Sequence, residues 1–98
     1  MAGTAGLCVA ARLTENPEVK VGVLEAGEDR MTDPLVSTPS NYPAMIGRED
    51  YDWCFRTIPQ EHAGGKRMSQ PRGKVLGGSS AINYLMYVRG SKADYDGW

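Results

Sequence analysis

The chain has 98 residues, of which 41% are hydrophobic and 23% charged, and its net charge is -1 at pH 7. These are ordinary globular values, and the length allows one domain at most. The near-neutral charge, without blocks of one sign, speaks against nucleic acid as a partner. No stretch approaches the ~20 apolar residues of a membrane span.

The N-terminal third predicts a helix and then a strand. Residues 4–14 (TAGLCVAARLT) carry apolar or small side chains at most positions, which indicates a buried helix. Asn16-Pro17 ends it, because the residue before proline is pushed out of the α region. Residues 19–27 (VKVGVLEAG) predict a strand, and its valines and leucine favour burial on both faces, as in a parallel sheet.

The remaining segments alternate loops with short predicted elements. Residues 30–50 contain three prolines and predict a long loop, which is unusual unless the loop covers something. Residues 51–58 (YDWCFRTI) predict a short strand, and residues 81–88 (AINYLMYV) predict a short buried helix. Ser91 and Asp94 match a capping box, which predicts a further helix.

The cysteines and the lone histidine indicate no metal site. Cys8 and Cys54 form neither a metal-binding pattern nor a disulfide framework, so we expect buried free thiols. His62 lies in a polar, glycine-containing loop, where we expect it to be solvated.

The first residues contain most of a dinucleotide-binding pattern. Met1–Gly6 follows G-x-G-x-x-G with methionine in place of the first glycine, and Gly3 and Gly6 lead into the predicted helix. Glu25 follows about 20 residues later at the end of the predicted strand, where an acid binds a ribose hydroxyl. An acid there disfavours the 2′-phosphate of NADP, whereas NAD and FAD both remain open. Taken alone, the glycine pattern is also explained by a frayed N-terminus, and Glu25 by a surface glutamate at the end of a strand.

A second glycine-rich stretch, PRGKVLGGSSAIN, occupies residues 71–83. Its Gly77–Ser80 tetrapeptide suits either a flexible linker or a place where backbone contacts a ligand. Together with ARLTENPEVKVGVLEAG near the N-terminus, the stretch resembles the glucose–methanol–choline (GMC) family of flavin-dependent alcohol oxidoreductases. The resemblance covers essentially the whole chain. YDW at 51–53 and IPQ at 58–60 are also similar to the aryl-alcohol and choline-dehydrogenase-like branches.

The resemblance implies an α/β fold. The chain would be a fragment, residues 1–98, of a Rossmann-like FAD-binding domain of the GMC type, lacking its first strand and the C-terminal substrate domain. Some members attach flavin through a histidine that would align with Ile82, so FAD held here would be non-covalent. The resemblance implies cofactor contacts for the pyrophosphate turn Gly3, Thr4, Ala5 and Gly6, for Glu25 at the adenosine ribose, for Val75, Gly78 and Ser79 near the second glycine-rich turn, and for Asn83, Tyr84 and Met86 on the flavin side.

The implied activity is oxidation of CH–OH groups of small-molecule alcohols, with hydride transfer to flavin N5. The family's proton-accepting histidine belongs to its C-terminal region, so no catalytic residue is assigned. Arg72 and Arg89 could pair with cofactor phosphate or form structural salt bridges. We expect the isolated chain to fold poorly and to bind FAD weakly or not at all. A non-catalytic remnant and an NAD-binding module are the alternatives, and substrate, electron acceptor, localisation and oligomeric state stay open.

Overall fold

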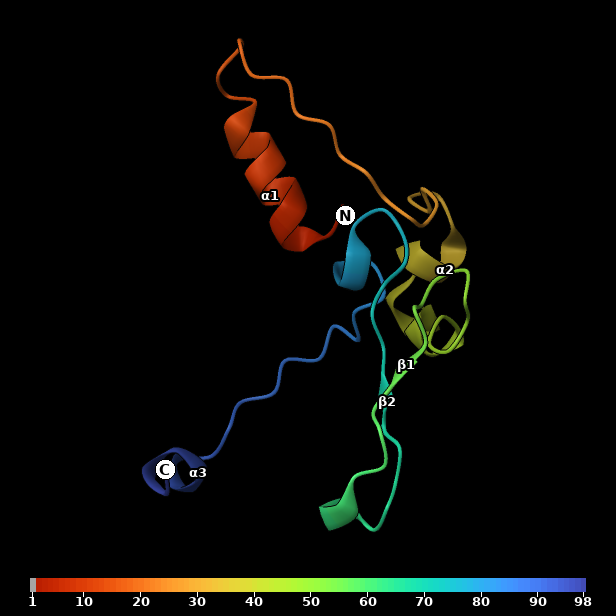
Figure 1. The fold of residues 1–98 in the computed structure, drawn as a ribbon, viewed down its shortest axis with the longest axis vertical. Coiled ribbons are helices and arrows are strands. Elements are labelled where there is room, and N and C mark those ends of the chain that lie inside the picture. The colour runs from red at the N-terminus through yellow and green to blue at the C-terminus, as the bar shows by residue number, and fades with distance from the viewer. Residues whose placement is uncertain (1) are drawn as a thin grey trace.

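The computed structural model describes residues 2–98 (Figure 1). Its elements are short and widely spaced. The radius of gyration is 17.3 Å, against about 13 Å for a compact domain of this size. The elements are helices α1 (Thr4–Leu13), α2 (Pro34–Ser37) and α3 (Lys92–Asp96), strands β1 (Phe55–Arg56) and β2 (Ser69–Gln70), and 3₁₀ helices η1 (Pro39–Ala44), η2 (Glu61–Ala63) and η3 (Gly78–Ser80).

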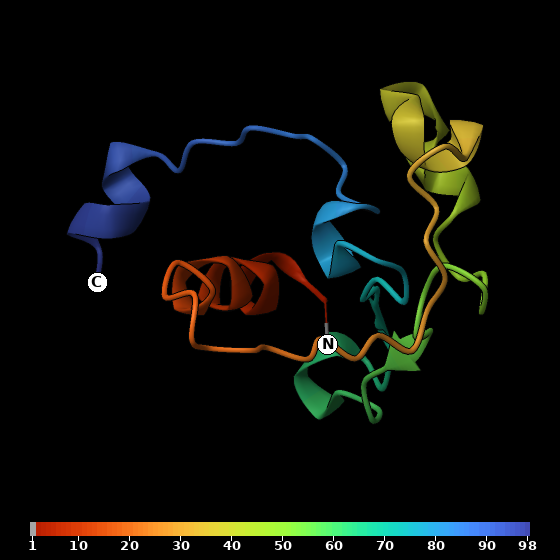
Figure 2. The same cartoon turned by 90° about the horizontal axis from the view of Figure 1, so that it is seen from above.

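Helix α1 confirms the predicted helix but not its burial. Alanine, leucine and arginine favour the helical state in its sequence, and Thr14 ends it with a hydroxyl that donates to the Ala10 carbonyl. The helix contains no buried residue. Figures 1 and 2 show why: α1 stands apart and approaches the rest of the chain at its N-terminal end, where it contacts η3.

The strand predicted at residues 19–27 is wrong for the described chain. No ladder forms there, and Leu24 is 84% exposed. Among the described residues, the only pairing near this segment is a parallel bridge between Glu28 and Val75, supported by the Leu76 N–H donating to the Glu28 carbonyl at 3.0 Å. A strand pattern needs neighbouring strands for its hydrogen bonds, and among residues 2–98 none lies alongside this segment.

The small core lies between the 30–50 segment and the glycine-rich stretch. Met45, Tyr51, Val75 and Ile82 are buried there. Side chains from α2 and η1 pack against them, among them Leu35 and Tyr42, so the long proline-containing segment does cover something.

A long irregular hairpin carries the two strands. Phe55 pairs with Gln70 in the antiparallel register, and a bridge between Asp52 and Gly73 extends the pairing to the base of the hairpin. The predicted 51–58 strand is therefore only partly confirmed, because regular pairing is limited to Phe55–Arg56.

The helix predicted at residues 81–88 is wrong. Residues 83–90 have no regular structure, and Leu85 adopts a positive φ of 54°. Asparagine, tyrosine and β-branched residues are only moderate helix formers, and most side chains here are exposed, with Tyr87 at 95%. No packed face compensates for the weak propensity. By contrast, the capping box is confirmed: Ser91 and Asp94 exchange hydrogen bonds at the start of α3.

Both cysteines are free thiols, as expected, but neither is buried. Cys8 is exposed on α1 and Cys54 is half-buried in the hairpin. Within the described residues, no helix has the length and apolar character needed to cross a bilayer.

Candidate cofactor-binding site

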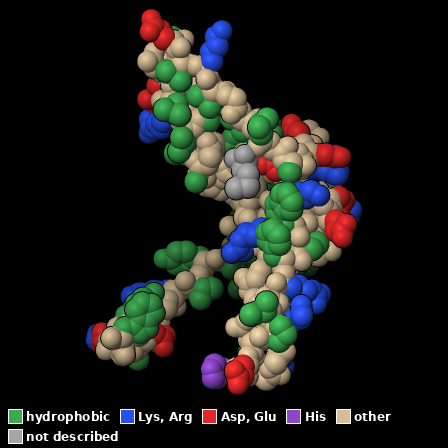
Figure 3. All heavy atoms as spheres, viewed as in Figure 1, with side chains coloured by type: hydrophobic (Ala, Val, Ile, Leu, Met, Phe, Trp, Pro, Cys, Tyr) green, Lys and Arg blue, Asp and Glu red, His purple; other side chains and the backbone are tan. Residues whose placement is uncertain are grey.

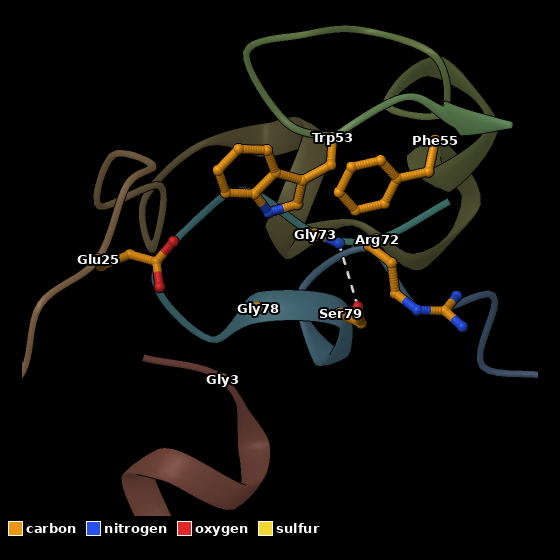
Figure 4. Close-up of a pocket in the computed structure, with 8 residues that line it drawn as sticks. All are labelled: Gly3, Glu25, Trp53, Phe55, Arg72, Gly73, Gly78 and Ser79. Carbon is orange, nitrogen blue, oxygen red and sulfur yellow. Dashed lines mark hydrogen bonds between the residues drawn. The ribbon is translucent and has the colours of Figure 1, made fainter. Parts of the chain in front are cut away.

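A cavity of about 460 Å³ opens where the base of the hairpin, η3 and the N-terminus of α1 meet (Figure 4). Four of its lining residues belong to the cofactor residues implied by the sequence, although they come from three separate segments. The lining consists of Gly3, Glu25, Trp53, Phe55, Arg72, Gly73, Gly78 and Ser79.

Three glycines, Gly3, Gly77 and Gly78, bring α1 and η3 together at this cavity. The Gly77 N–H donates to the Ala2 carbonyl at 2.7 Å, and Gly3 and Gly77 form a parallel bridge. Gly78 has a φ of +59°, and a Cβ added there would lie 2.7 Å from the Gly3 Cα. Glycine is therefore required at Gly78 both for its conformation and for the close approach. The linker interpretation does not suit this stretch, since Gly78 is buried.

The Glu25 carboxylate is held at the edge of the cavity by two backbone donors. Its Oε1 accepts from the Gly27 N–H at 3.1 Å and its Oε2 from the Ala2 N–H at 2.7 Å. These bonds, the one from Gly27 foremost, lower the pKa of Glu25 below its ordinary value, so the group is ionised at neutral pH. A carboxylate offers about four acceptor positions, which leaves about two for ligand hydroxyls.

The first turn of α1 presents backbone N–H groups beside the glycine contact. Thr4, Ala5 and Gly6 form this turn and are exposed. Gly3 at the N-cap offers no side-chain acceptor, and the turn contains no acidic residue. The first N–H groups of a helix have no partner within the helix, so an anion is stabilised there.

The hairpin supplies the wall that sequence reasoning missed. Trp53 and Phe55 line the cavity with their rings, and Arg72 and Gly73 line it from the opposite strand (Figure 4). The YDW tripeptide resembles the GMC family, but nothing in the linear sequence places Trp53 beside Glu25. Among the described residues Arg72 makes no salt bridge; its guanidinium donates to the Pro71 carbonyl at 2.6 Å.

Asp52 holds this wall in place. Its buried carboxylate accepts hydrogen bonds from the N–H groups of Gly47, Cys54 and Arg72 at 2.9–3.1 Å. Burial alone would raise the pKa of Asp52, but the three N–H donors outweigh it and the pKa is lowered. The charged group therefore joins three backbone segments at the base of the hairpin.

A second cavity, of about 270 Å³, adjoins the first through Ser79. Asn83 and Tyr84 line it together with Ile82. The Ser79 hydroxyl accepts from the Gly73 N–H at 3.1 Å, which fixes this side chain between the two cavities (Figure 4).

Five of the implied cofactor residues lie outside both cavities, namely Thr4, Ala5 and Gly6 in the first turn of α1, Val75 and Met86. The Val75 side chain is fully buried in the core, and Met86 is 66% exposed on the irregular C-terminal segment. His62 is exposed at η2, the tip of the hairpin, and Arg89 is exposed without a salt bridge in the described chain. Residues 2–98 contain no group of three or more metal-ligating side chains.

The family model described as GMC oxidoreductase matches residues 1–98. The chain belongs to the GMC oxidoreductase family. It is 46% identical over 98% of its length to an oxygen-dependent choline dehydrogenase of Brucella anthropi and covers 17% of that protein. The first relatives are likewise matched over only 15–19% of their length, so the chain spans less than a fifth of them.

Solved GMC oxidoreductases share the fold. The crystal structure of pyridoxine 4-oxidase from Mesorbium loti is 41% identical with a TM-score of 0.79, over 99% of this chain and 19% of that one. A formate oxidase variant from Aspergillus oryzae, solved to study FAD modification, is 41% identical with a TM-score of 0.75, over 99% and 17%. The chain thus matches the N-terminal part of FAD-containing family members.

The residues present fit a dinucleotide such as FAD. Glycines form the close contact between α1 and η3, exposed helix amides lie beside it, and an ionised carboxylate stands at the cavity edge. The cavity volume is within the 300–1,000 Å³ typical of ligand pockets, near its lower end.

Proposed function

We propose that this chain forms the FAD-binding portion of an oxidoreductase that acts on CH–OH groups of small-molecule alcohols. The observation that carries the proposal is that Gly3, Glu25 and Gly78, from three separate segments, line one cavity. That combination supplies the hydroxyl acceptor and the close backbone approach that a dinucleotide needs.

Each region would contact a different part of FAD. Glu25 would accept hydrogen bonds from the adenosine ribose, and the turn from Gly3 to Gly6 would donate amides to the pyrophosphate. Ser79, Asn83 and Tyr84 would contact the flavin side through the second cavity. Val75 could do so only through its backbone, and Met86 only after the C-terminal segment folds against the site.

Binding would be non-covalent, and no catalytic residue is proposed. Ile82, which would align with the flavin-attaching histidine of some relatives, is 3% exposed in the core and has no reactive group. The chemistry that FAD supplies when bound is acceptance of a hydride from the alcohol carbon. The chain's own residues, 1–98, would position the cofactor as a fragment of a Rossmann-like FAD-binding domain of the GMC type.

A chimera tests the proposal. Residues 2–98 replace the matching segment of the solved pyridoxine 4-oxidase, which is 41% identical to them. We expect a yellow protein that contains FAD, released in free form by acid denaturation. A chimera that folds by circular dichroism yet stays colourless and takes up no added FAD would contradict the proposal. If the same chimera bound NAD instead, the NAD-binding alternative would hold.

The isolated chain is a second test. Hydrophobic side chains lie on the open surface of α1 (Figure 3), and residues 83–88 are largely exposed as well, so we expect weaker FAD binding than in the chimera. Flavin fluorescence titration measures the FAD affinity of the isolated chain and of the chimera. An isolated chain that binds FAD as tightly as the chimera would show that the expectation of poor folding is wrong, although it would support FAD binding itself.

A further inference from the structure

Trp53 and Phe55 form an aromatic shelf that the small core does not use. Their rings are nearly parallel, with an interplanar angle of 3° and centroids 6.0 Å apart. They are 39% and 52% exposed, and both line the first cavity. Figure 4 shows them side by side above Gly78 and Ser79. Large aromatic rings that face a cavity offer a flat apolar surface to a planar ligand.

The backbone around the shelf is held in an uncommon conformation. Cys54, between the two aromatic residues, has a φ of +55°, which non-glycine residues rarely adopt. The Asp52 carboxylate accepts from the Cys54 N–H, and the Trp53 N–H donates to the Arg72 carbonyl at 2.9 Å. The Lys74 ammonium lies 5.3 Å from the centroid of the Trp53 ring. These hydrogen bonds and the Lys74 contact therefore hold the backbone and the ring of Trp53 in place.

The surroundings indicate which planar ring the shelf would take. Glu25, the candidate ribose acceptor, stands at the Trp53 side of the same cavity (Figure 4). Asn83 and Tyr84, implied on the flavin side, line the other cavity. We propose that the shelf of Trp53 and Phe55 stacks against the adenine ring of the dinucleotide, an inference that rests on the proposed FAD-binding function.

The expected effect follows from base stacking. Removing one aromatic side chain from a stacked base weakens binding by roughly 5- to 150-fold. Trp53→Ala should therefore weaken both FAD and ADP, which contain adenine. It should leave FMN unchanged, because FMN contains the flavin ring without adenine. Trp53→Phe keeps a ring and should change FAD affinity by less than about 5-fold.

The test measures dissociation constants of FAD, FMN and ADP for the apo form of the chimera defined above. Trp98→Ala is the matched control, because it removes the same side chain from an exposed position outside both cavities. It should change none of the three constants. Circular dichroism checks folding, and Phe55→Leu removes the second ring with a smaller change in volume if Trp53→Ala does not fold.

Each outcome decides between the proposals. Equal losses of FAD and FMN affinity in Trp53→Ala would mean that the shelf contacts flavin, and unchanged FAD and ADP affinities would mean that it contacts neither ring. Both overturn the adenine assignment and leave FAD binding intact. Conversely, Trp53-dependent ADP binding without any FAD binding would support the shelf and overturn the proposed function. A wild-type chimera that binds none of the three ligands overturns both.

Discussion

Gly78→Ala should damage the site more than any exposed glycine substitution. An alanine there would be strained by the positive φ of +59°, and its Cβ would lie 2.7 Å from the Gly3 Cα. The Gly3 Cα is a backbone atom, and the added Cβ is attached directly to the backbone of residue 78. The clash therefore cannot be relieved by rotating a flexible side chain. The N-terminus of α1 and η3 would have to move apart, which opens the cavity that both line.

The Gly64→Ala variant is a control that separates backbone strain at positive φ from the steric clash with Gly3. Gly64 has nearly the same φ, +66°, but nothing lies within 4 Å of an added Cβ at the tip of the hairpin. Both variants carry the left-handed strain of about 1–2 kcal/mol. Only Gly78→Ala adds the overpacking cost of about 1–3 kcal/mol. If binding needs the closed contact, FAD affinity should fall by roughly 5- to 150-fold relative to Gly64→Ala.

Flavin fluorescence titration of the two variant apo-chimeras measures this difference, and circular dichroism confirms that each is folded. Equal FAD affinities in Gly78→Ala and Gly64→Ala would refute the reasoning, because the clash with Gly3 would then have no consequence for the cofactor. A third variant, Gly22→Ala, adds a methyl group in open space without positive φ and should match the wild type.

Three further outcomes follow from buried or hydrogen-bonded groups. Asp52→Ala leaves buried N–H donors without their acceptor and should lower the free energy of unfolding by about 2–4 kcal/mol in urea denaturation, more than Asp52→Asn. Because backbone N–H bonds keep the pKa of Asp52 lowered despite burial, its contribution is present above about pH 4 and is lost as the pH falls through the lowered pKa; Asp52→Asn should abolish this dependence. Glu25→Ala should weaken FAD binding by roughly 10- to 100-fold, and an unchanged dissociation constant would rule out its ribose role. Iodoacetamide at pH 8, followed by mass spectrometry, should label exposed Cys8 before Cys54, since burial and then the charge of Asp52 raise the pKa of Cys54.

Local signals were predictable from the sequence, whereas elements that depend on distant partners were not. The helix at 4–14 and the capping box of Ser91 and Asp94 depend on neighbouring residues, and both form. The strand at 19–27 and the helix at 81–88 were inferred from apolar patterns that assume a packed face. Leu24 and Tyr87 are exposed instead, so neither pattern gains the burial that would stabilise a regular element.

The predicted cofactor residues show the same division. Gly3 and Glu25 were predicted from the dinucleotide-binding pattern, and Gly78 and Ser79 from the family resemblance, and the structure brings all four to one cavity. That Val75 is buried in the core could not be read from its motif, since burial is decided by Met45 and its neighbours, some 30 residues earlier in the chain.

The position of the aromatic wall, Trp53 and Phe55, depends on strand pairing, which no sequence motif specifies. Trp53 lines the cavity in a hairpin register where Asp52 pairs with Gly73, and the buried Asp52 carboxylate also accepts a hydrogen bond from the Arg72 N–H across the hairpin. Side chains alternate between faces along paired strands, so a slip of one residue in this register would turn Trp53 away from Glu25. The buried Asp52 carboxylate, remote in sequence from the glycine-rich turns, thereby helps to hold Trp53 and Glu25 at the same cavity.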